Sequence, residues 1–135
     1  EREVSIRFEE NNVKQRVRPD ITSNGRLGDY KSTRDPNPLN TFYRAVRRYR
    51  YDLSAVMYQR GCEAAGIAEG PMVFIVTSTV GDCQTQVVEL HSSIIERAEA
   101  EYDHLIDTLR LCRENNCWTP NGYGEIGVVG TPWQV

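Results

Sequence analysis

Lysine is scarce in this 135-residue sequence, although basic residues are not. Arginine supplies fourteen of the sixteen basic residues, and only Lys14 and Lys31 are lysine. A guanidinium pairs with phosphate oxygens through a planar fork of donors, whereas an ammonium is a compact point charge whose pKa is readily tuned. The scarcity therefore singles out Lys31, which lies close to two aspartates, as a lysine that can serve where arginine cannot.

Long apolar runs and closely spaced cysteine pairs are also missing. No stretch approaches the ~18 consecutive apolar residues of a membrane span. Zinc sites usually draw their ligands from close cysteine pairs, but no CxxC pair occurs among Cys62, Cys83, Cys112 and Cys117. We interpret all four as reduced thiols in a cytoplasmic protein, with Cys62 and Cys83 inside apolar-patterned segments. The hydrophobic content of 39% predicts a single folded domain over residues 1–135.

The net charge of −3 conceals a strong division along the chain. Residues 13–60 contain eleven basic and four acidic residues, whereas residues 61–135 contain three basic and eleven acidic residues. The first stretch therefore carries a net charge of +7 and the second a net charge of −8. Such an asymmetry is typical of a chain with a charged interaction surface, and it keeps nucleic acid among the candidate partners.

Hydrophobic periodicity predicts an α/β (α+β) fold. Alternation predicts strands at residues 3–8, 13–21 and 84–90, flanking turns predict a short one at 26–32, and a nearly continuous apolar run predicts a buried one at 72–78. Spacing near 3.6 predicts helices at residues 39–65 and 92–114. Short turns join the first three strands, which are therefore expected to form an antiparallel meander. The predicted domain is a mixed central sheet with this initial meander, flanked by two long helices.

Three ionisable side chains are predicted to converge where the second and third strands meet. Asp20 follows Pro19 at the end of the second strand, and Asp29 and Lys31 lie two residues apart on the third strand. Residues two apart project from the same face of a strand. We therefore expect a hairpin to bring Asp20 beside the face that carries Asp29 and Lys31.

This grouping predicts a site for Mg²⁺, or Mn²⁺, in an enzyme that hydrolyses phosphodiesters. Two carboxylates, waters and a backbone carbonyl, for which Tyr30 is the candidate, provide the hard oxygen ligands that these cations prefer. An adjacent lysine can orient the attacking water and neutralise developing charge. A cross-strand salt bridge is the simpler alternative, because Asp-x-Lys is a common tripeptide. The position of Asp20, the +7 stretch and the arginine-rich helix that follows favour the catalytic interpretation.

The order of these residues resembles the PD-(D/E)xK nuclease motif, with Pro19-Asp20 followed by Asp29-Tyr30-Lys31. The segments VRPDIT, GDYKST and YRYDLSAVMYQRG look like the nuclease domain of the RecE (exonuclease VIII) family of phage and prophage recombination exonucleases. The segment GPMVFIVTST, the acidic second helix and Pro132-Trp133 also resemble the C-terminal half of that family. The resemblance covers nearly the whole chain.

The resemblance implies a Mg²⁺-dependent exonuclease that digests one strand of duplex DNA from its 5′ end and leaves a 3′ single strand for recombination. It implies Asp20 and Asp29 as metal ligands and Lys31 as the catalytic lysine. It further implies double-stranded DNA ends as substrate, a single-strand annealing protein as partner, a ring-shaped homo-oligomer, and the cytoplasm of a bacterial or phage-infected cell.

The first predicted helix adds residues expected to contact DNA. Relatives carry a Gln-x-x-x-Tyr element there; Tyr58 matches its tyrosine, whereas Ser54 stands at the glutamine position. Phosphate contacts that position DNA without reading its sequence are expected from Arg34, Arg44, Arg47, Arg48 and Arg50. The alternative for these arginines is a solvated helix face. The tyrosines interpreted as core or groove lining rather than base-stacking platforms are Tyr43, Tyr49, Tyr51 and Tyr58.

Two departures from the family keep other functions open. The first is Ser54. The second is that relatives place a helical segment with a further metal ligand before the first strand, so we expect this chain to lack that segment and to digest DNA weakly without it. The same three motif residues also serve RecB-type nucleases and endonucleases. A DNA-binding domain of this fold without turnover is the non-enzymatic alternative.

Overall fold

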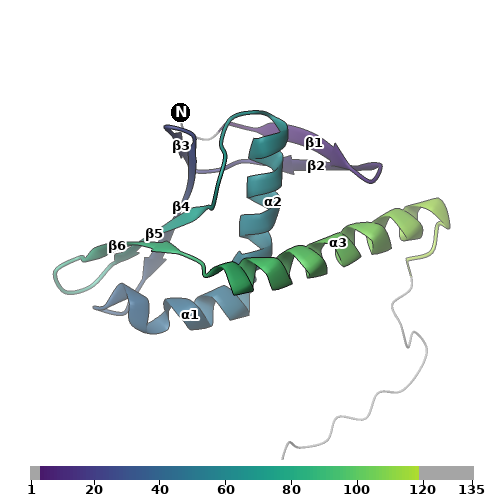
Figure 1. Ribbon diagram of the computed structural model, residues 1–135. Helices are drawn as coiled ribbons and strands as arrows, with labels where there is room; N and C mark the ends of the chain where they lie inside the picture. Colours follow the sequence, from purple (N-terminus) through teal and green to yellow (C-terminus); the bar gives the residue numbers. More distant parts are fainter. Residues whose placement is uncertain (1–3, 119–135) are drawn as a thin grey trace, which may run out of the picture.

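Residues 4–118, which the computed structural model describes, form two β-sheets and three helices (Figure 1). The strands are β1 (Ile6–Glu10), β2 (Val13–Val17), β3 (Ile21–Ser23), β4 (Arg26–Thr33), β5 (Val73–Ser78) and β6 (Thr85–Glu89). The helices are α1 (Pro38–Tyr49), α2 (Tyr51–Ala64) and α3 (Ser92–Glu114). Pro132 and Trp133 of the family resemblance lie outside the described residues.

The sheets are a separate hairpin, β1–β2, and a four-stranded sheet in the order β3-β4-β5-β6. Within the larger sheet, β4 and β5 are parallel and the other neighbours are antiparallel. The two-residue turns between β1 and β2 and between β3 and β4 use residues with positive φ, at Asn11-Asn12 and Asn24-Gly25, as the tight turns that suit twisted strands require. Because β4 and β5 are parallel, α1 and α2 form the crossover between them.

The strand predicted over residues 13–21 is two strands that belong to different sheets. β2 ends at Val17 and β3 begins at Ile21. Pro19 between them is fully buried and has no N–H to continue a ladder. Pairing therefore stops, and the chain passes from the hairpin to the four-stranded sheet. The predicted meander is wrong at this point, and Asp20 lies in the link between the sheets rather than at a strand end.

The single helix predicted over residues 39–65 is also wrong, because the chain turns at Arg50. This residue has φ 55° and ψ 46°, a left-handed conformation that costs a non-glycine residue ~1–2 kcal/mol. Its guanidinium offsets that cost by pairing with the carboxylates of Asp52 and Glu101, at 2.6–3.3 Å. α1 and α2 therefore run in different directions, and α2 continues toward the β1–β2 hairpin (Figure 1).

Apolar side chains form two adjoining clusters between these layers. Phe74 of β5 is fully buried at the first, with its ring centroid 5.4 Å from that of Phe42 and 5.8 Å from that of Tyr51. The second cluster joins β2, α2 and α3 and includes the buried Val56 and Ile106. The first cluster fixes α1 on the sheet, and the second fixes α3 against α2.

A polar network docks the hairpin on the helices. The Tyr102 hydroxyl lies 2.7 Å from a carboxylate oxygen of Glu10 and 2.6 Å from the amide oxygen of Gln15. Burial raises the pKa of Tyr102, so the phenol stays protonated and remains a donor. Arg60 of α2 forms ion pairs with both Glu10 and Asp103. The hairpin, α2 and α3 are thus tied together by side chains rather than by backbone pairing.

The remaining sequence expectations have mixed outcomes. α3 confirms the helix predicted over residues 92–114, and the His91 ring accepts the Ser93 N–H at its start. Cys62 is buried, but Cys83 is exposed in the loop between β5 and β6, so its predicted place in an apolar segment is wrong. None of the helices within residues 4–118 combines the length and apolar character that crossing a membrane requires.

We expect the substitution Gly61→Ala to destabilise the fold. A β-carbon at Gly61 would lie 2.7 Å from Cγ2 of Val17 and 2.9 Å from the ring of Phe8. Overpacking of this kind costs about 1–3 kcal/mol, which outweighs the gain of about 1 kcal/mol that alanine brings to a helix. Thermal unfolding followed by circular dichroism should show a lower midpoint.

Gly28→Ala is the matched control for this experiment. Its added β-carbon would meet its neighbours at 3.8 Å, an ordinary contact distance. If Gly61→Ala unfolded at the same temperature as the wild type, the close approach of α2 to the hairpin would be refuted.

Candidate active site

Asp20, Asp29 and Lys31 lie together where the link before β3 meets β4. The backbone N–H of Tyr30 donates to Oδ2 of Asp20 over 2.8 Å, which holds this carboxylate against β4. The Lys31 ammonium forms an ion pair with Oδ2 of Asp29. The predicted convergence of the three side chains is therefore present in the structure.

The position of β4 inside the sheet explains how this group is placed. Asp29 and Lys31 pair in register with Phe74 and Val76 of β5, and residues paired in register share a face. That face is covered by α1 and α2, and Nζ of Lys31 lies 4.7 Å from the ring centroid of Tyr51. Asp29 is only 7% exposed. A carboxylate and an ammonium are thus held on the apolar, helix-covered face of the sheet.

The electrostatics of Asp29 reflect this burial. Loss of solvent raises the pKa of Asp29, the Lys31 ammonium opposes the rise, and the neighbouring carboxylate of Asp20 adds to it. Two carboxylates this close destabilise each other in the charged state unless a cation lies between them. Oδ2 of Asp29 is buried and, apart from the Lys31 ammonium, meets no polar partner in the described part of the chain.

These residues fit a divalent cation of the Mg²⁺ class. A second cation would relieve the repulsion between Asp20 and Asp29 and would use the buried oxygen of Asp29. Within residues 4–118 no group of three or more His, Cys, Asp or Glu is arranged so that it could hold a metal ion. Mg²⁺ is commonly held by one or two carboxylates together with waters and substrate phosphates, so two carboxylates are sufficient for such a site.

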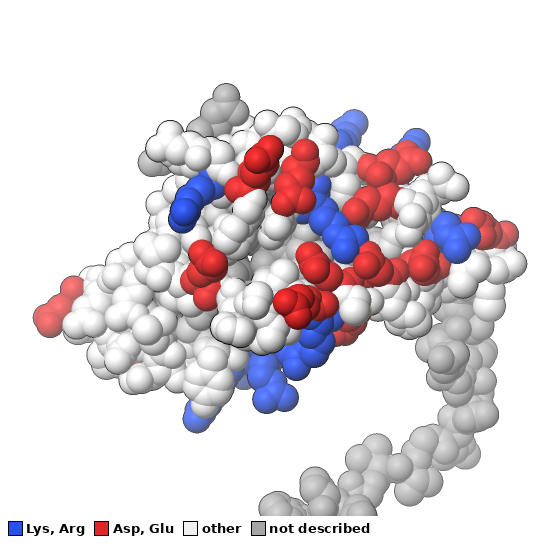
Figure 2. Space-filling view, in the orientation of Figure 1, with Lys and Arg blue, Asp and Glu red and all other residues white. Residues whose placement is uncertain are grey.

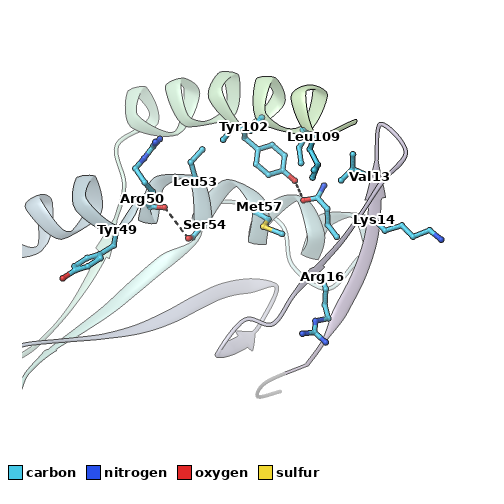
Figure 3. Close-up of a pocket in the computed structure, with 13 residues that line it drawn as sticks. Val13, Lys14, Arg16, Tyr49, Arg50, Leu53, Ser54, Met57, Tyr102 and Leu109 are labelled. Atoms are coloured by element: carbon cyan, nitrogen blue, oxygen red, sulfur yellow. Dashed lines mark hydrogen bonds between the residues drawn. The ribbon is translucent and has the colours of Figure 1, made fainter. Parts of the chain in front are cut away.

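The two predicted residues of α2 are in different surroundings. Burial raises the pKa of Tyr58, and the charges of Asp29 and Asp20 raise it further. This phenol therefore stays protonated beside the carboxylates and can donate a hydrogen bond. Ser54 instead donates from Oγ to the carbonyl of Arg50 over 3.4 Å and faces the groove of about 550 Å³ under α3 (Figure 3).

The predicted arginines of α1 are exposed. Arg44, Arg47 and Arg48 project into solvent, and Figure 2 shows basic side chains along the lower edge, where α1 lies, and acidic ones gathered over α3. The guanidinium of Arg50 is instead occupied by Asp52 and Glu101. A phosphate contact by Arg50 would require these ion pairs to open.

Sequence reasoning missed a cavity of about 260 Å³ beside Lys31. Its polar lining includes Arg34 and the hydroxyls of Thr33 and Thr41, whose oxygens lie 3.3 Å apart. Tyr49 also lines it and is 58% exposed. The run of hydroxyl and arginine side chains directly after Lys31 is the one signal in the sequence that could have indicated it.

The four tyrosines interpreted as core or groove lining fall into an exposed pair and a partly buried pair. Tyr43 and Tyr49 are each 58% exposed and line grooves, the second of the two predicted positions. Tyr51 and Tyr58 are partly buried and pack against the larger core cluster.

Comparison with known proteins supports the fold. The sequence profile of a family described as "PDDEXK-like domain of unknown function (DUF3799)" matches residues 1–128. The structure is similar to a crystal structure from Eubacterium rectale named "putative exonuclease", with a TM-score of 0.62 and 15% sequence identity. The similarity covers 98% of this chain and 54% of that chain, so this chain spans about half its length. No curated protein matches the sequence. The predicted mixed α+β nuclease-like architecture is confirmed.

We expect Arg50→Ala to lower the free energy of unfolding. The substitution leaves the carboxylate of Asp52, a residue only 4% exposed, without its guanidinium partner, and an unpaired buried polar group costs about 1–3 kcal/mol. Arg47→Ala, on the exposed side of α1, should change stability by less than about 0.5 kcal/mol. Urea unfolding followed by circular dichroism measures both, and equal stabilities would contradict the role of Arg50 at the helix break.

We also expect Mg²⁺ or Mn²⁺ to raise the temperature of unfolding. A ligand that binds only the folded state stabilises it, by about 2.7 kcal/mol at 100 times its dissociation constant. Asp20→Asn and Asp29→Asn should lose most of the shift in differential scanning fluorimetry. Asp82→Asn, in the exposed loop between β5 and β6, is the control and should retain it. A shift that survives in Asp29→Asn would place the cation elsewhere.

Proposed function

We propose, from the premise that the chain belongs to the family of PDDEXK-like domains, that it is a nuclease that hydrolyses phosphodiester bonds of DNA. The observation that carries this proposal is the meeting of Asp20, Asp29 and Lys31 on the helix-covered face of the sheet. Their order in the sequence is that of the PD-(D/E)xK motif. The exposed arginines of α1 supply the positive surface that a polyanion requires.

Asp20 and Asp29, together with the backbone carbonyl of Tyr30, are the residues that would hold Mg²⁺ or Mn²⁺. When bound, the cation supplies Lewis-acid polarisation of a phosphoryl oxygen and makes water more acidic. The buried Asp29 carboxylate favours this role because a charge so poorly solvated gains most from a counter-ion.

Lys31 stabilises charge and orients water at the site, and Tyr58 donates a hydrogen bond. The ion pair with Asp29 keeps the Lys31 ammonium at the site, where it orients the attacking water and stabilises negative charge as it develops on the phosphoryl group. Tyr58, protonated at neutral pH, donates a hydrogen bond to the substrate strand. Arg34, Arg44, Arg47 and Arg48 position phosphates without reading bases.

We further propose that the whole protein acts as a 5′→3′ exonuclease on double-stranded DNA ends, as the RecE-like motifs imply. The name of the Eubacterium rectale relative agrees with an exonuclease. The same resemblance supports a role in phage or prophage recombination in the cytoplasm, with an annealing protein that receives the 3′ strand and a homo-oligomeric ring around DNA.

The decisive experiment is digestion of end-labelled linear and covalently closed circular duplex in Mg²⁺. We expect the linear duplex alone to be degraded, from its 5′ ends, and Lys31→Ala to lower the rate by at least about 100-fold, the scale on which a single positioned charge-stabilising group acts. Lys14→Ala, the other lysine of the chain and an exposed residue of β2, is the matched control and should keep its activity.

Other outcomes assign other functions. Cleavage of the circle identifies an endonuclease of the same superfamily. Retained DNA binding without cleavage, in the longest natural form of the polypeptide, identifies a binding domain of this fold, an outcome consistent with the position of Ser54 away from the carboxylates.

A further inference from the structure

We propose that the cavity beside Lys31 is a nucleotide subsite, in which Tyr49 stacks on a base and Arg34, Thr33 and Thr41 bind the adjoining phosphate. The inference rests on the proposed function, since it concerns the strand that passes Lys31. It assigns a base-stacking role to a tyrosine that the sequence analysis interpreted as core or groove lining.

The polar part of the cavity suits a phosphate. Its volume of about 260 Å³ is below the ~300–1,000 Å³ of pockets for drug-sized ligands, so the expected occupant is small. None of its described lining residues is acidic, whereas Lys31 and Arg34 are both cationic. The hydroxyls of Thr33 and Thr41 lie 3.3 Å apart and share a hydrogen bond, so one of the two keeps its O–H free to donate to a phosphate.

The helix that carries Thr41 strengthens this preference. α1 is twelve residues long and begins at Pro38, so Thr41 lies in its first turn. No acidic residue lies within that turn, and the carboxylate of Asp35, before the helix, accepts from the Asn37 N–H and from Nδ2 of Asn40. An anion in the cavity would therefore lie near a helix start, the Arg34 guanidinium and two hydroxyls, beside the Lys31 ammonium that pairs with Asp29.

The aromatic part of the cavity suits a base. Tyr49 stacks on Tyr51, with ring centroids 5.7 Å apart and an interplanar angle of 28°. Tyr51 in turn lies 4.7 Å from Nζ of Lys31 and stacks on the buried Phe74. A column of rings thus runs from the core, past the candidate catalytic lysine, to the surface at Tyr49.

Tyr49 completes this column with a ring that remains accessible. It is 58% exposed, and Figure 3 shows its side chain directed away from α3. Every base has an apolar face that stacks on an aromatic ring, worth ~1–3 kcal/mol per base. The Arg48 guanidinium lies 5.5 Å from the centroid of Tyr49. A base that stacks on the ring takes the place of Arg48, whose guanidinium then pairs with the DNA backbone.

Tyr43 provides a control because it shares the helix, the exposure and the arginine contact of Tyr49 but does not line the cavity at Lys31. It lies on the same helix, is also 58% exposed, and has the Arg44 guanidinium 5.5 Å from its ring centroid. It lines a different groove, between α1 and the chain that joins β6 to α3. Tyr49 differs from Tyr43 in lining the cavity at Lys31 and in stacking on Tyr51.

The test uses duplex oligonucleotides that carry the fluorescent base 2-aminopurine at one of the first three positions from the 5′ end. Ca²⁺ replaces Mg²⁺ so that the strand stays intact, which a denaturing gel verifies. At saturating wild-type protein we expect at least one position to lose half or more of its fluorescence, because stacking quenches it. Tyr49→Leu should abolish this quenching and weaken binding by about 5- to 150-fold. Tyr49→Phe should preserve it, and so should Tyr43→Leu.

The phosphate part is tested by the same titration with Arg34→Ala and Thr41→Val. If the cavity holds a terminal phosphate, removal of the 5′ phosphate from the oligonucleotide weakens wild-type binding but not that of the variants. If it holds an internal phosphodiester, a neutral methylphosphonate at that linkage has this effect instead. Both results support the subsite and identify the source of the phosphate. Wild-type affinity of both variants for every oligonucleotide would overturn the phosphate contact.

The stacking inference fails if Tyr49→Leu, folded as judged by its circular dichroism and unfolding temperature, quenches 2-aminopurine like the wild type. It also fails if Tyr43→Leu loses the quenching equally. The proposed nuclease function fails separately, if quenching depends on Tyr49 but linear duplex in Mg²⁺ is not cleaved. If Tyr49→Leu quenches like the wild type and also cleaves DNA at the wild-type rate, the nuclease function is retained and the subsite is refuted.

Discussion

The left-handed turn at Arg50 is the constraint on which the arrangement of the helices depends. One residue ends α1 and precedes α2, and its guanidinium binds Asp52 at the start of α2 and Glu101 in the middle of α3. The turn lets α1 lie along the four-stranded sheet while α2 crosses to the hairpin. It therefore places Tyr58 of α2 near the carboxylates of Asp29 and Asp20, and it lets Tyr49 stack on Tyr51.

The candidate active site shows how a fold can keep a carboxylate in a buried position that disfavours its charge. Asp29 is buried on an apolar face beside a second carboxylate, which is electrostatically unfavourable for it. The flanking strand and the rings of Tyr51 and Phe74 hold the backbone of β4 in place regardless of that charge. Stability comes from the apolar clusters, and the energy of a poorly solvated carboxylate remains available for binding a cation.

The sequence predicts some of these features well because they depend on short-range periodicity. The two-residue spacing of Asp29 and Lys31 places both on one face, and the acidic amphipathic pattern defines α3 from Ser92 to Glu114. The turn at Arg50 could not be predicted in this way, because its stabilising partner Glu101 lies 51 residues later. The cavity beside Lys31 likewise depends on α1 and α2 meeting the end of β4, which no local pattern records.

The link at residues 18–20 has a mechanical consequence for the site. The β1–β2 hairpin shares no backbone ladder with the four-stranded sheet, and it is held by Tyr102, by Arg60 and by close packing on Gly61. Asp20 belongs to the link between these two bodies, whereas Asp29 is inside the sheet. The Tyr30 N–H in turn holds the Asp20 carboxylate against β4, so the position of this carboxylate depends on that hydrogen bond as well as on the link. The candidate metal site thus takes one carboxylate from a strand inside the sheet and the other from the segment that joins the sheet to the hairpin.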